Sequence, residues 1–188
     1  MSGKIIIFSA PSGAGKTTIA KEILKRIPEL IFSVSACSRP MRNGERDGVD
    51  YYFLSVEDFK KKIDNNEFLE WQEVYPGSYY GTLKKEVERI WQEGKNVMFD
   101  VDTFGGINIK NIYKEKALSI FIKTLTPEIL NERLTSRGTE SQDSLKKRMD
   151  KANIELSHSN EFDKIIINDN LNKAIEEAYT TITEFLNN

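Results

Sequence analysis

The sequence is poor in cysteine and has no long apolar run. Its single cysteine, Cys37, excludes an internal disulfide and suits a reducing compartment; we expect a small packed residue rather than a reactive thiol. No apolar run approaches the length that spans a membrane. The first residues also lack the basic segment, the long apolar segment and the cleavage site of a signal peptide. These absences predict a cytoplasmic protein without membrane contact.

An excess of charge of either sign is also missing. The 27 basic and 29 acidic residues give a net charge of −2, which indicates no general nucleic-acid or membrane surface. We find no internal repeat and no low-complexity tract. With 188 residues, 39% of them hydrophobic and 30% charged, the chain fits one globular domain with a sizeable core.

Residues 4–18 have the order of a strand, a loop and a helix start. Residues 5–8 are an apolar run that suits a strand buried on both faces, and residues 10–17 read A-x-x-x-x-G-K-T, the spacing of a phosphate-binding P-loop. In such a loop, backbone N–H groups surround the phosphates of a nucleotide, and the following helix adds the positive end of its dipole. The alternative is a Gly-rich turn without a ligand, which this spacing disfavours.

Side chains of the P-loop carry part of the predicted chemistry. Lys16 would reach the β- and γ-phosphates, the Thr17 hydroxyl would bind Mg²⁺, and Thr18 is a weaker phosphate candidate. Ala10 stands where glycine is commoner, which is tolerable if its φ is negative. The residues predicted to surround the phosphates are Ala10, Pro11, Ser12, Gly13, Ala14, Gly15, Lys16, Thr17 and Thr18.

Beyond the P-loop, strands alternate with helices. This order predicts an α/β protein with a parallel sheet covered on both faces, interrupted by an α+β insertion at about residues 35–82. The expected strands are 5–8, 31–37, 51–54, 68–74, 97–99, 117–122 and 165–167. The expected helices are 16–27, 56–63, 83–94, 127–138, 145–156 and 171–185.

Two sets of arginines could bind phosphate groups. Arg39 and Arg42, with Glu45 nearby and Tyr51 beyond, suit a phosphate dianion, although a solvated charged loop fits the composition equally well. In the second set, the four-residue spacing of two arginines puts them on one helical face, and a third lies on the next helix. They could close over a polyphosphate, whereas each alone would read as a surface residue. This second set is Arg133, Arg137 and Arg148.

Two carboxylates follow an apolar strand, at the edge where open α/β sheets bind ligands. Asp100 and Asp102 are two residues apart, so we expect them to point the same way and to order Mg²⁺ and its waters or to hold an acceptor. No catalytic base is evident, because the one histidine, His158, is most simply a surface residue. A phosphate acceptor would need none, since its second pKa is about 6.

These motifs together resemble the guanylate kinases over essentially the whole chain. The segments that carry the resemblance are SAPSGAGKTT, SRPMRNGERDGVDYYF, EFLEW, SYYGT, DVD, NERLTSRGTES and IINDNL. The resemblance implies a three-layer P-loop NTPase fold and Mg²⁺-dependent phosphoryl transfer from ATP to GMP, and to dGMP as well. It further implies a core of residues 1–34, 83–125 and 158–188, a GMP-binding lobe at 35–82 and a lid at 126–157. The oligomeric state, monomer or homodimer, stays open.

The resemblance also assigns roles by matching position. The GMP phosphate would be held by Arg39, Arg42, Tyr51 and Tyr80, with Glu45 beside them, and guanine would be read by Ser35, Glu70 and Thr82. The acceptor and metal region would be supported by Asp100 and Asp102, the transferred phosphate by Arg133, Arg137 and Arg148, and the adenine surroundings by Asn168. Without the resemblance, Glu70 reads as an exposed strand carboxylate.

The sequence departs from the family pattern at four further positions. Cys37 and Ser38 stand where threonines are common, Met41 where proline is common, and Phe104 where glutamine is common, which puts the contacts of that turn in doubt. Two other functions fit the resemblance: an inactive guanylate-kinase-like binding module, and a kinase for another phosphorylated acceptor such as a ribose bisphosphate. The intact P-loop and arginines argue against the first, and the guanine-reading set argues against the second.

Overall fold

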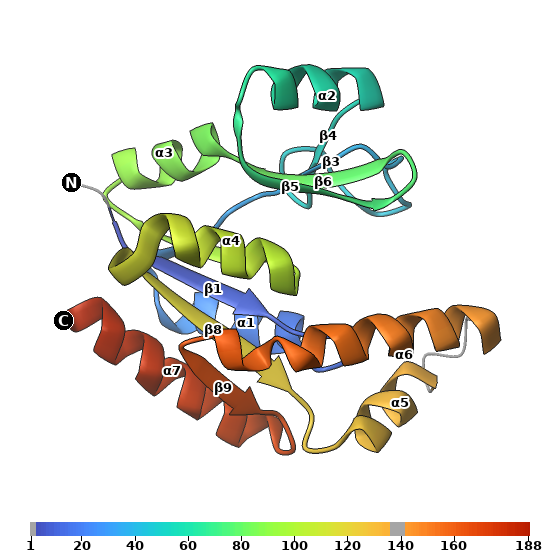
Figure 1. The fold of residues 1–188 in the computed structure, drawn as a ribbon. Helices are drawn as coiled ribbons and strands as arrows, with labels where there is room; N and C mark the ends of the chain where they lie inside the picture. Colours follow the sequence, from blue (N-terminus) through green and yellow to red (C-terminus); the bar gives the residue numbers. More distant parts are fainter. Residues whose placement is uncertain (1–2, 136–141) are drawn as a thin grey trace.

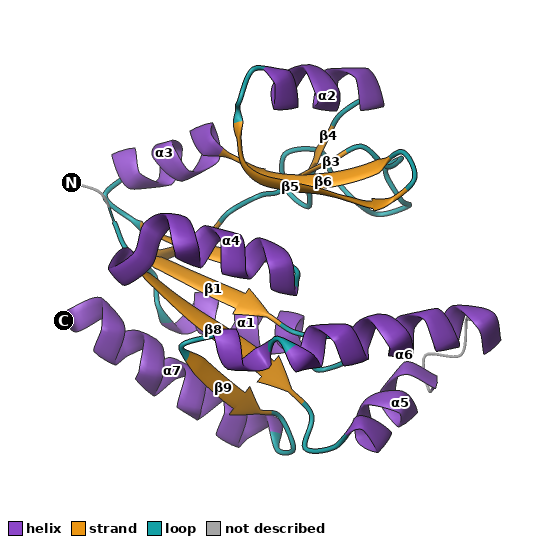
Figure 2. Ribbon diagram, in the orientation of Figure 1, coloured by secondary structure: helices purple, strands orange, loops and turns teal. Residues whose placement is uncertain are grey.

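The computed structural model describes residues 3–135 and 142–188 of the chain (Figures 1 and 2). A parallel sheet with the strand order β2-β7-β1-β8-β9 forms its centre. The strands are β1 Ile5–Ser9, β2 Leu30–Phe32, β7 Asn96–Asp100, β8 Ala117–Lys123 and β9 Lys164–Ile167. The predicted α/β fold with a central parallel sheet is therefore confirmed.

Helices cover both faces of this sheet, as its central strand requires. Alternate residues of a strand point to opposite faces, and all five residues of β1 are buried. Ile5 and Ile7 belong to the core under α3 (Lys84–Gln92) and α4 (Thr103–Tyr113). On the other face, Ile6 and Phe8 belong to the core under α1 (Lys16–Arg26) and α7 (Leu171–Asn187).

A second, smaller sheet forms a lobe with its own core, at the top of Figure 1. Its strand order is β4-β3-β6-β5, and helix α2 packs on it. The elements are β3 Ala36–Cys37, β4 Tyr52–Phe53, α2 Val56–Asp64, β5 Phe68–Tyr75 and β6 Ser78–Leu83. Ser55 is the N-cap of α2, and its hydroxyl accepts a hydrogen bond from the Asp58 N–H at 3.0 Å.

One expected strand is wrong, and two elements were not expected. The strand expected at 31–37 is wrong: it is two strands in two different sheets, because residues 33–35 carry the chain from the core to the lobe. Strand β6 and helix α4 were not predicted. Both contain glycines, which lower the propensity for regular structure.

Two helices extend from the carboxyl end of the sheet, at the right of Figure 1. They are α5, Pro127–Thr135, and α6, Gln142–Ser157. Arg137 and the end of the helix expected at 127–138 lie outside the described residues. Two short 3₁₀ helices, Lys114–Lys116 and Ser159–Glu161, complete the fold. Within the described ranges, no helix is long and apolar enough to cross a membrane.

Candidate active site

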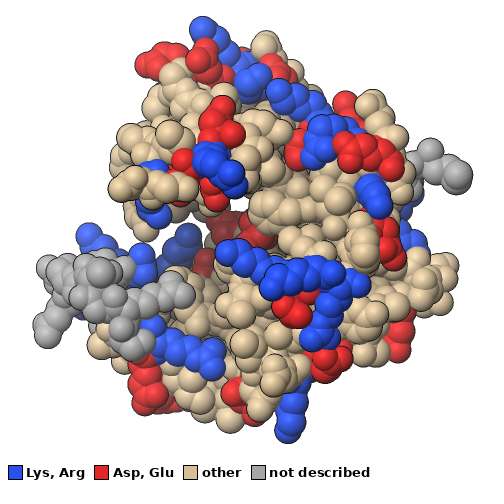
Figure 3. Space-filling view, turned by 180° about the vertical axis from the view of Figure 1, so that it is seen from behind, with Lys and Arg blue, Asp and Glu red and all other residues tan. Residues whose placement is uncertain are grey.

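A cleft of about 840 Å³ separates the P-loop end of the central sheet from the lobe. Figure 3 shows this hollow from behind, with acidic side chains in its depth. The cleft is continuous, so one cavity contacts the P-loop, the end of β7, the lobe sheet and helix α6. Its predicted lining residues are Ala10, Pro11, Ser12, Gly13, Gly15, Lys16, Thr17, Thr18, Ser35, Glu45, Tyr51, Glu70, Tyr80, Asp100 and Asp102.

Backbone conformation at two glycines shapes the P-loop. Gly13 and Gly15 have φ values of 93° and 95°, which residues with side chains rarely adopt, so glycine suits both positions. Ala10 is not among the described residues with positive φ, which removes the objection to alanine there. Asn168, expected near adenine, donates from Nδ2 to the Ala14 carbonyl at 2.8 Å and so lies against the P-loop.

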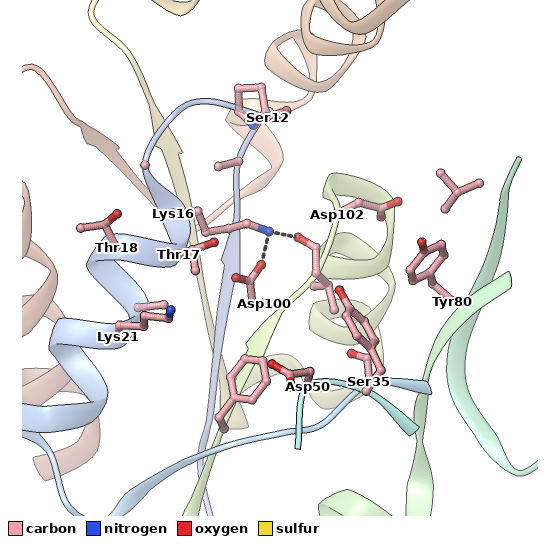
Figure 4. Close-up of a pocket in the computed structure, with 18 of the residues that line it drawn as sticks. Ser12, Lys16, Thr17, Thr18, Lys21, Ser35, Asp50, Tyr80, Asp100 and Asp102 are labelled. Atoms are coloured by element: carbon pink, nitrogen blue, oxygen red, sulfur yellow. Dashed lines mark hydrogen bonds and ion pairs between the residues drawn. The ribbon is translucent and has the colours of Figure 1, made fainter. Parts of the chain in front are cut away.

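Lys16 reaches from the P-loop to the end of β7. Its ammonium forms an ion pair with Asp100 and donates to the Val101 carbonyl at 2.8 Å (Figure 4). Parallel pairing of β1 with β7 places Phe8 beside Asp100, which brings the two loops together. The Lys16 ammonium is thus held at the carboxyl end of the core strand β7.

Asp100 and Asp102 line the same cleft, as predicted, but they have different partners. Strand β7 ends at Asp100, so the two-residue alternation no longer applies to Asp102. The Asp102 carboxylate is the N-cap of the unpredicted helix α4 and accepts from the Gly105 N–H at 2.8 Å. Its backbone carbonyl accepts from the Ser9 hydroxyl at 3.1 Å. Asp102 is therefore fixed by local structure, whereas Asp100 is fixed by Lys16.

Glu70 projects from β5 into the lobe side of the cleft. Its carboxylate accepts a hydrogen bond of 2.7 Å from the hydroxyl of Thr82, which lies opposite on β6. Burial raises the pKa of Glu70 to about 7; the Thr82 hydrogen bond opposes the rise, and the charge of Asp102 adds to it. The alternative of an exposed strand carboxylate is wrong. The Glu70 carboxylate is instead a half-buried hydrogen-bond acceptor, and Ser35 lines the same cavity.

Arg39 is held by its own carboxylate and by aromatic rings. It forms two hydrogen bonds with Glu45, of 2.7 and 2.6 Å, and stacks over Tyr51 at 5.0 Å. The Arg39 hydrogen bond lowers the pKa of Glu45 to about 2. The solvated-loop alternative is wrong for Arg39, whose side chain is 11% exposed, but it describes Arg42, which is exposed. Neither arginine is among the residues that line the cleft.

The helical arginines are only partly placed at the site. Arg133 on α5 donates to the Asn168 carbonyl at 3.1 Å and so lies next to the P-loop. Arg148 on α6 is half-buried and does not line the cleft, and Arg137 lies outside the described residues. Their joint closure over a polyphosphate stays a prediction. His158 is a surface residue, as expected, with 35% of its side chain exposed, and its ring meets that of Phe104, the residue put in doubt above, at 5.0 Å.

Several cleft residues were missed from the sequence. Gln72 lies two residues beyond Glu70 on the same strand, and Lys151 and Glu155 come from α6. Glu155 is 6% exposed, and burial raises its pKa. The period of two along β5 is a signal that could have found Gln72. The helical spacing of Glu155 from the buried Ala152 could have indicated an inward position.

A P-loop at the carboxyl edge of a parallel sheet, joined by one cleft to a second lobe, defines a P-loop phosphotransferase. The guanylate kinase family model matches residues 2–186. The chain is 50% identical over 187 residues to the guanylate kinase of Bacteroides thetaiotaomicron, covering 100% of this chain and 92% of that protein. It is 47% identical over 184 residues to that of Chlorobaculum tepidum, covering 98% and 94%.

A solved structure agrees. The crystal structure of guanylate kinase from Anaplasma phagocytophilum superposes with a TM-score of 0.77 at 27% identity, covering 97% of this chain and 86% of that one. The chain belongs to the guanylate kinase family. It is an enzyme, a nucleotide-dependent transferase, and the alternative of an inactive binding module receives no support.

Proposed function

We propose that the described cleft transfers the γ-phosphoryl group of ATP to GMP, giving ADP and GDP. The observation that carries this proposal is the continuity of the cleft, which joins the P-loop to Glu70 within one cavity. Two nucleotides bound at its two ends would meet near Lys16 and Asp100. Positioning of this kind supplies much of the rate of a phosphoryl transfer.

On the donor side, the P-loop N–H groups and Lys16 would bind the ATP phosphates. Arg133, Arg137 and Arg148 would stabilise the transferring group, and Asn168 would shape the adenine surroundings. Thr17 and Asp100 line this side, and no cluster of three acidic, histidine or cysteine side chains occurs among the described residues. That arrangement fits a Mg²⁺ ion bound mainly by phosphate oxygens and water. When bound, the ion would neutralise charge on the phosphates.

On the acceptor side, the ionised Glu70 would accept the N1–H and 2-amino donors of guanine, with Ser35 and Thr82 beside it. The GMP phosphate would contact Arg39, Arg42, Tyr51 and Tyr80, and Asp102 would border the ribose and phosphate. No general base is required, because a phosphate dianion is already a nucleophile. Burial of the acceptor and charge stabilisation would then carry the reaction.

The division into core, GMP-binding lobe (35–82) and lid (126–157) is part of the same proposal. It is supported by the lobe's separate sheet and core, and by helix α6, whose Lys151 and Glu155 line the cleft. We further propose a cytoplasmic enzyme that also accepts dGMP. A homodimer stays a prediction that light scattering can measure.

The test is a coupled assay of ADP formation with GMP, IMP, AMP, UMP and CMP as acceptors. GMP should be strongly preferred. Glu70→Ala should lower the kcat/KM for GMP by about 10² or more, because two charge-assisted hydrogen bonds are lost. The loss with IMP should be smaller, since IMP has no 2-amino group. Equal proportional losses for GMP and IMP would show that Glu70 does not read that edge of the base.

A further inference from the structure

Gln72 has a buried hydrogen-bonding atom without a partner in the part of the chain that the structure describes. Its side-chain oxygen, Oε1, is buried and has no hydrogen-bond partner there. Such groups are uncommon, because burying an acceptor without a partner costs free energy. The residue also lines the cleft. The missing partner is therefore expected from the ligand.

The strand geometry places Gln72 next to the guanine-reading residue. Glu70 and Gln72 are two apart on β5 and both line the cleft, whereas Trp71 between them is exposed. Gln72 lies opposite Tyr80 on β6, as Glu70 lies opposite Thr82. Directly opposite residues of an antiparallel pair share one face of the sheet, so all four lie on one face, and Glu70, Gln72 and Tyr80 line the cleft from it.

The positions of the donor groups on a guanine nucleotide indicate which of them Gln72 would contact. Glu70 is proposed to take the N1 and 2-amino donors of guanine, and the ribose 2′-hydroxyl lies on the same side of a nucleotide as that 2-amino edge. One step of two residues along a strand moves a side chain by about 7 Å, which is enough to pass from the base to the sugar. A hydroxyl is a donor, and the unpartnered Oε1 is an acceptor.

We propose that Gln72 accepts a hydrogen bond from the 2′-hydroxyl of the acceptor nucleotide and so makes the enzyme prefer GMP to dGMP. This inference rests on the proposed function. Gln72 is a specificity-determining residue in this assignment, and the phosphoryl transfer itself does not depend on it. Both GMP and dGMP remain substrates, and the ratio of their kcat/KM values measures the effect of this hydrogen bond.

The test compares kcat/KM for GMP and dGMP in the wild type, in Gln72→Met and in the control Gln92→Met, which alters an exposed glutamine on α3. The wild type should prefer GMP. Gln72→Met should lower the efficiency with GMP about tenfold and leave that with dGMP within about twofold. Gln72→Ala should give the same change in ratio, and Gln92→Met should give none.

Two outcomes would overturn the inference: equal use of GMP and dGMP by the wild type, or parallel losses with both nucleotides in the Gln72 variants. The first needs no variant, so it holds even if a substitution impairs folding. Parallel losses would indicate a structural role. A wild type that phosphorylates neither nucleotide would instead refute the proposed function, which keeps the two failures distinguishable.

Discussion

Replacing Glu70 with glutamine should stabilise the protein at alkaline pH in the absence of nucleotide, although it should impair GMP recognition. The carboxyl group lies in the cleft, and burial raises its pKa from 4.5 to about 7. Its one hydrogen-bond donor among the described side chains is Thr82, at 2.7 Å. An ionised carboxylate at this position therefore has too few hydrogen-bond donors until a ligand supplies more.

The sign and size of the effect follow from this pKa. Below about pH 4.5 the carboxyl is protonated in both the folded and the unfolded chain, and it carries no penalty. As the pH rises through about 7, the folded chain must ionise a buried carboxyl group, whereas the unfolded chain ionises an exposed one. The folded chain therefore loses stability relative to the unfolded chain over this pH range. A pKa displaced from 4.5 to about 7 corresponds to about 3 kcal/mol in the free energy of unfolding. A glutamine amide does not titrate, so it avoids this loss.

The assay is urea unfolding of the wild type and Glu70→Gln between about pH 5 and 8, without nucleotide. The stability of the variant relative to the wild type should rise with pH, by up to about 3 kcal/mol. Glu67→Gln is the control: hydrogen bonds from Lys62 and Asn65 lower the pKa of Glu67, so this carboxylate stays ionised in the folded and unfolded chains across this range, and its replacement should give a stability difference that does not change with pH. A stability difference between Glu70→Gln and wild type that does not change with pH would refute the reasoning.

Three other predictions concern the catalytic cycle. Lys16→Met should reduce turnover by orders of magnitude with the fold intact by circular dichroism, and near-normal turnover would exclude Lys16 from the chemistry. The KM for GMP should rise as the pH falls below about 7, because protonated Glu70 cannot accept both guanine donors; a KM independent of pH would count against it. ATP and GMP together should make the particle more compact in small-angle scattering, and a bisubstrate analogue that leaves it unchanged would contradict closure.

The P-loop could be predicted because its signals are local. The apolar run of β1, the glycine spacing and the lysine lie within one short segment, and each predicts the same strand, loop and helix start. The break in the strand expected at 31–37 was not predictable in this way. An apolar run indicates burial, but it does not indicate in which of two sheets each half will pair.

Helix α4 and strand β6 were missed for a physical reason that also locates the site. A Cβ added at Gly105 would lie 3.0 Å from a carboxylate oxygen of Glu70, and one added at Gly81 would lie 2.7 Å from the Glu70 carbonyl. Both glycines allow backbone to approach Glu70 closely, and both weaken the sequence signal of their own element. Glu70 itself was predicted from the family resemblance, because composition alone favoured an exposed carboxylate.

The two cations assigned to substrate phosphates are held in different ways before substrates bind. Arg39 is fixed by two hydrogen bonds to Glu45 and by the ring of Tyr51, so its guanidinium is already oriented and loses little side-chain entropy on meeting a phosphate. Lys16 is instead paired with Asp100, and it must leave this partner to follow a phosphoryl group. ATP binding should therefore release the Asp100 carboxylate on the side of the cleft where Thr17 lies. Under the proposed function, the acceptor side is therefore pre-organised, whereas the donor side would become complete only on binding of the nucleotide.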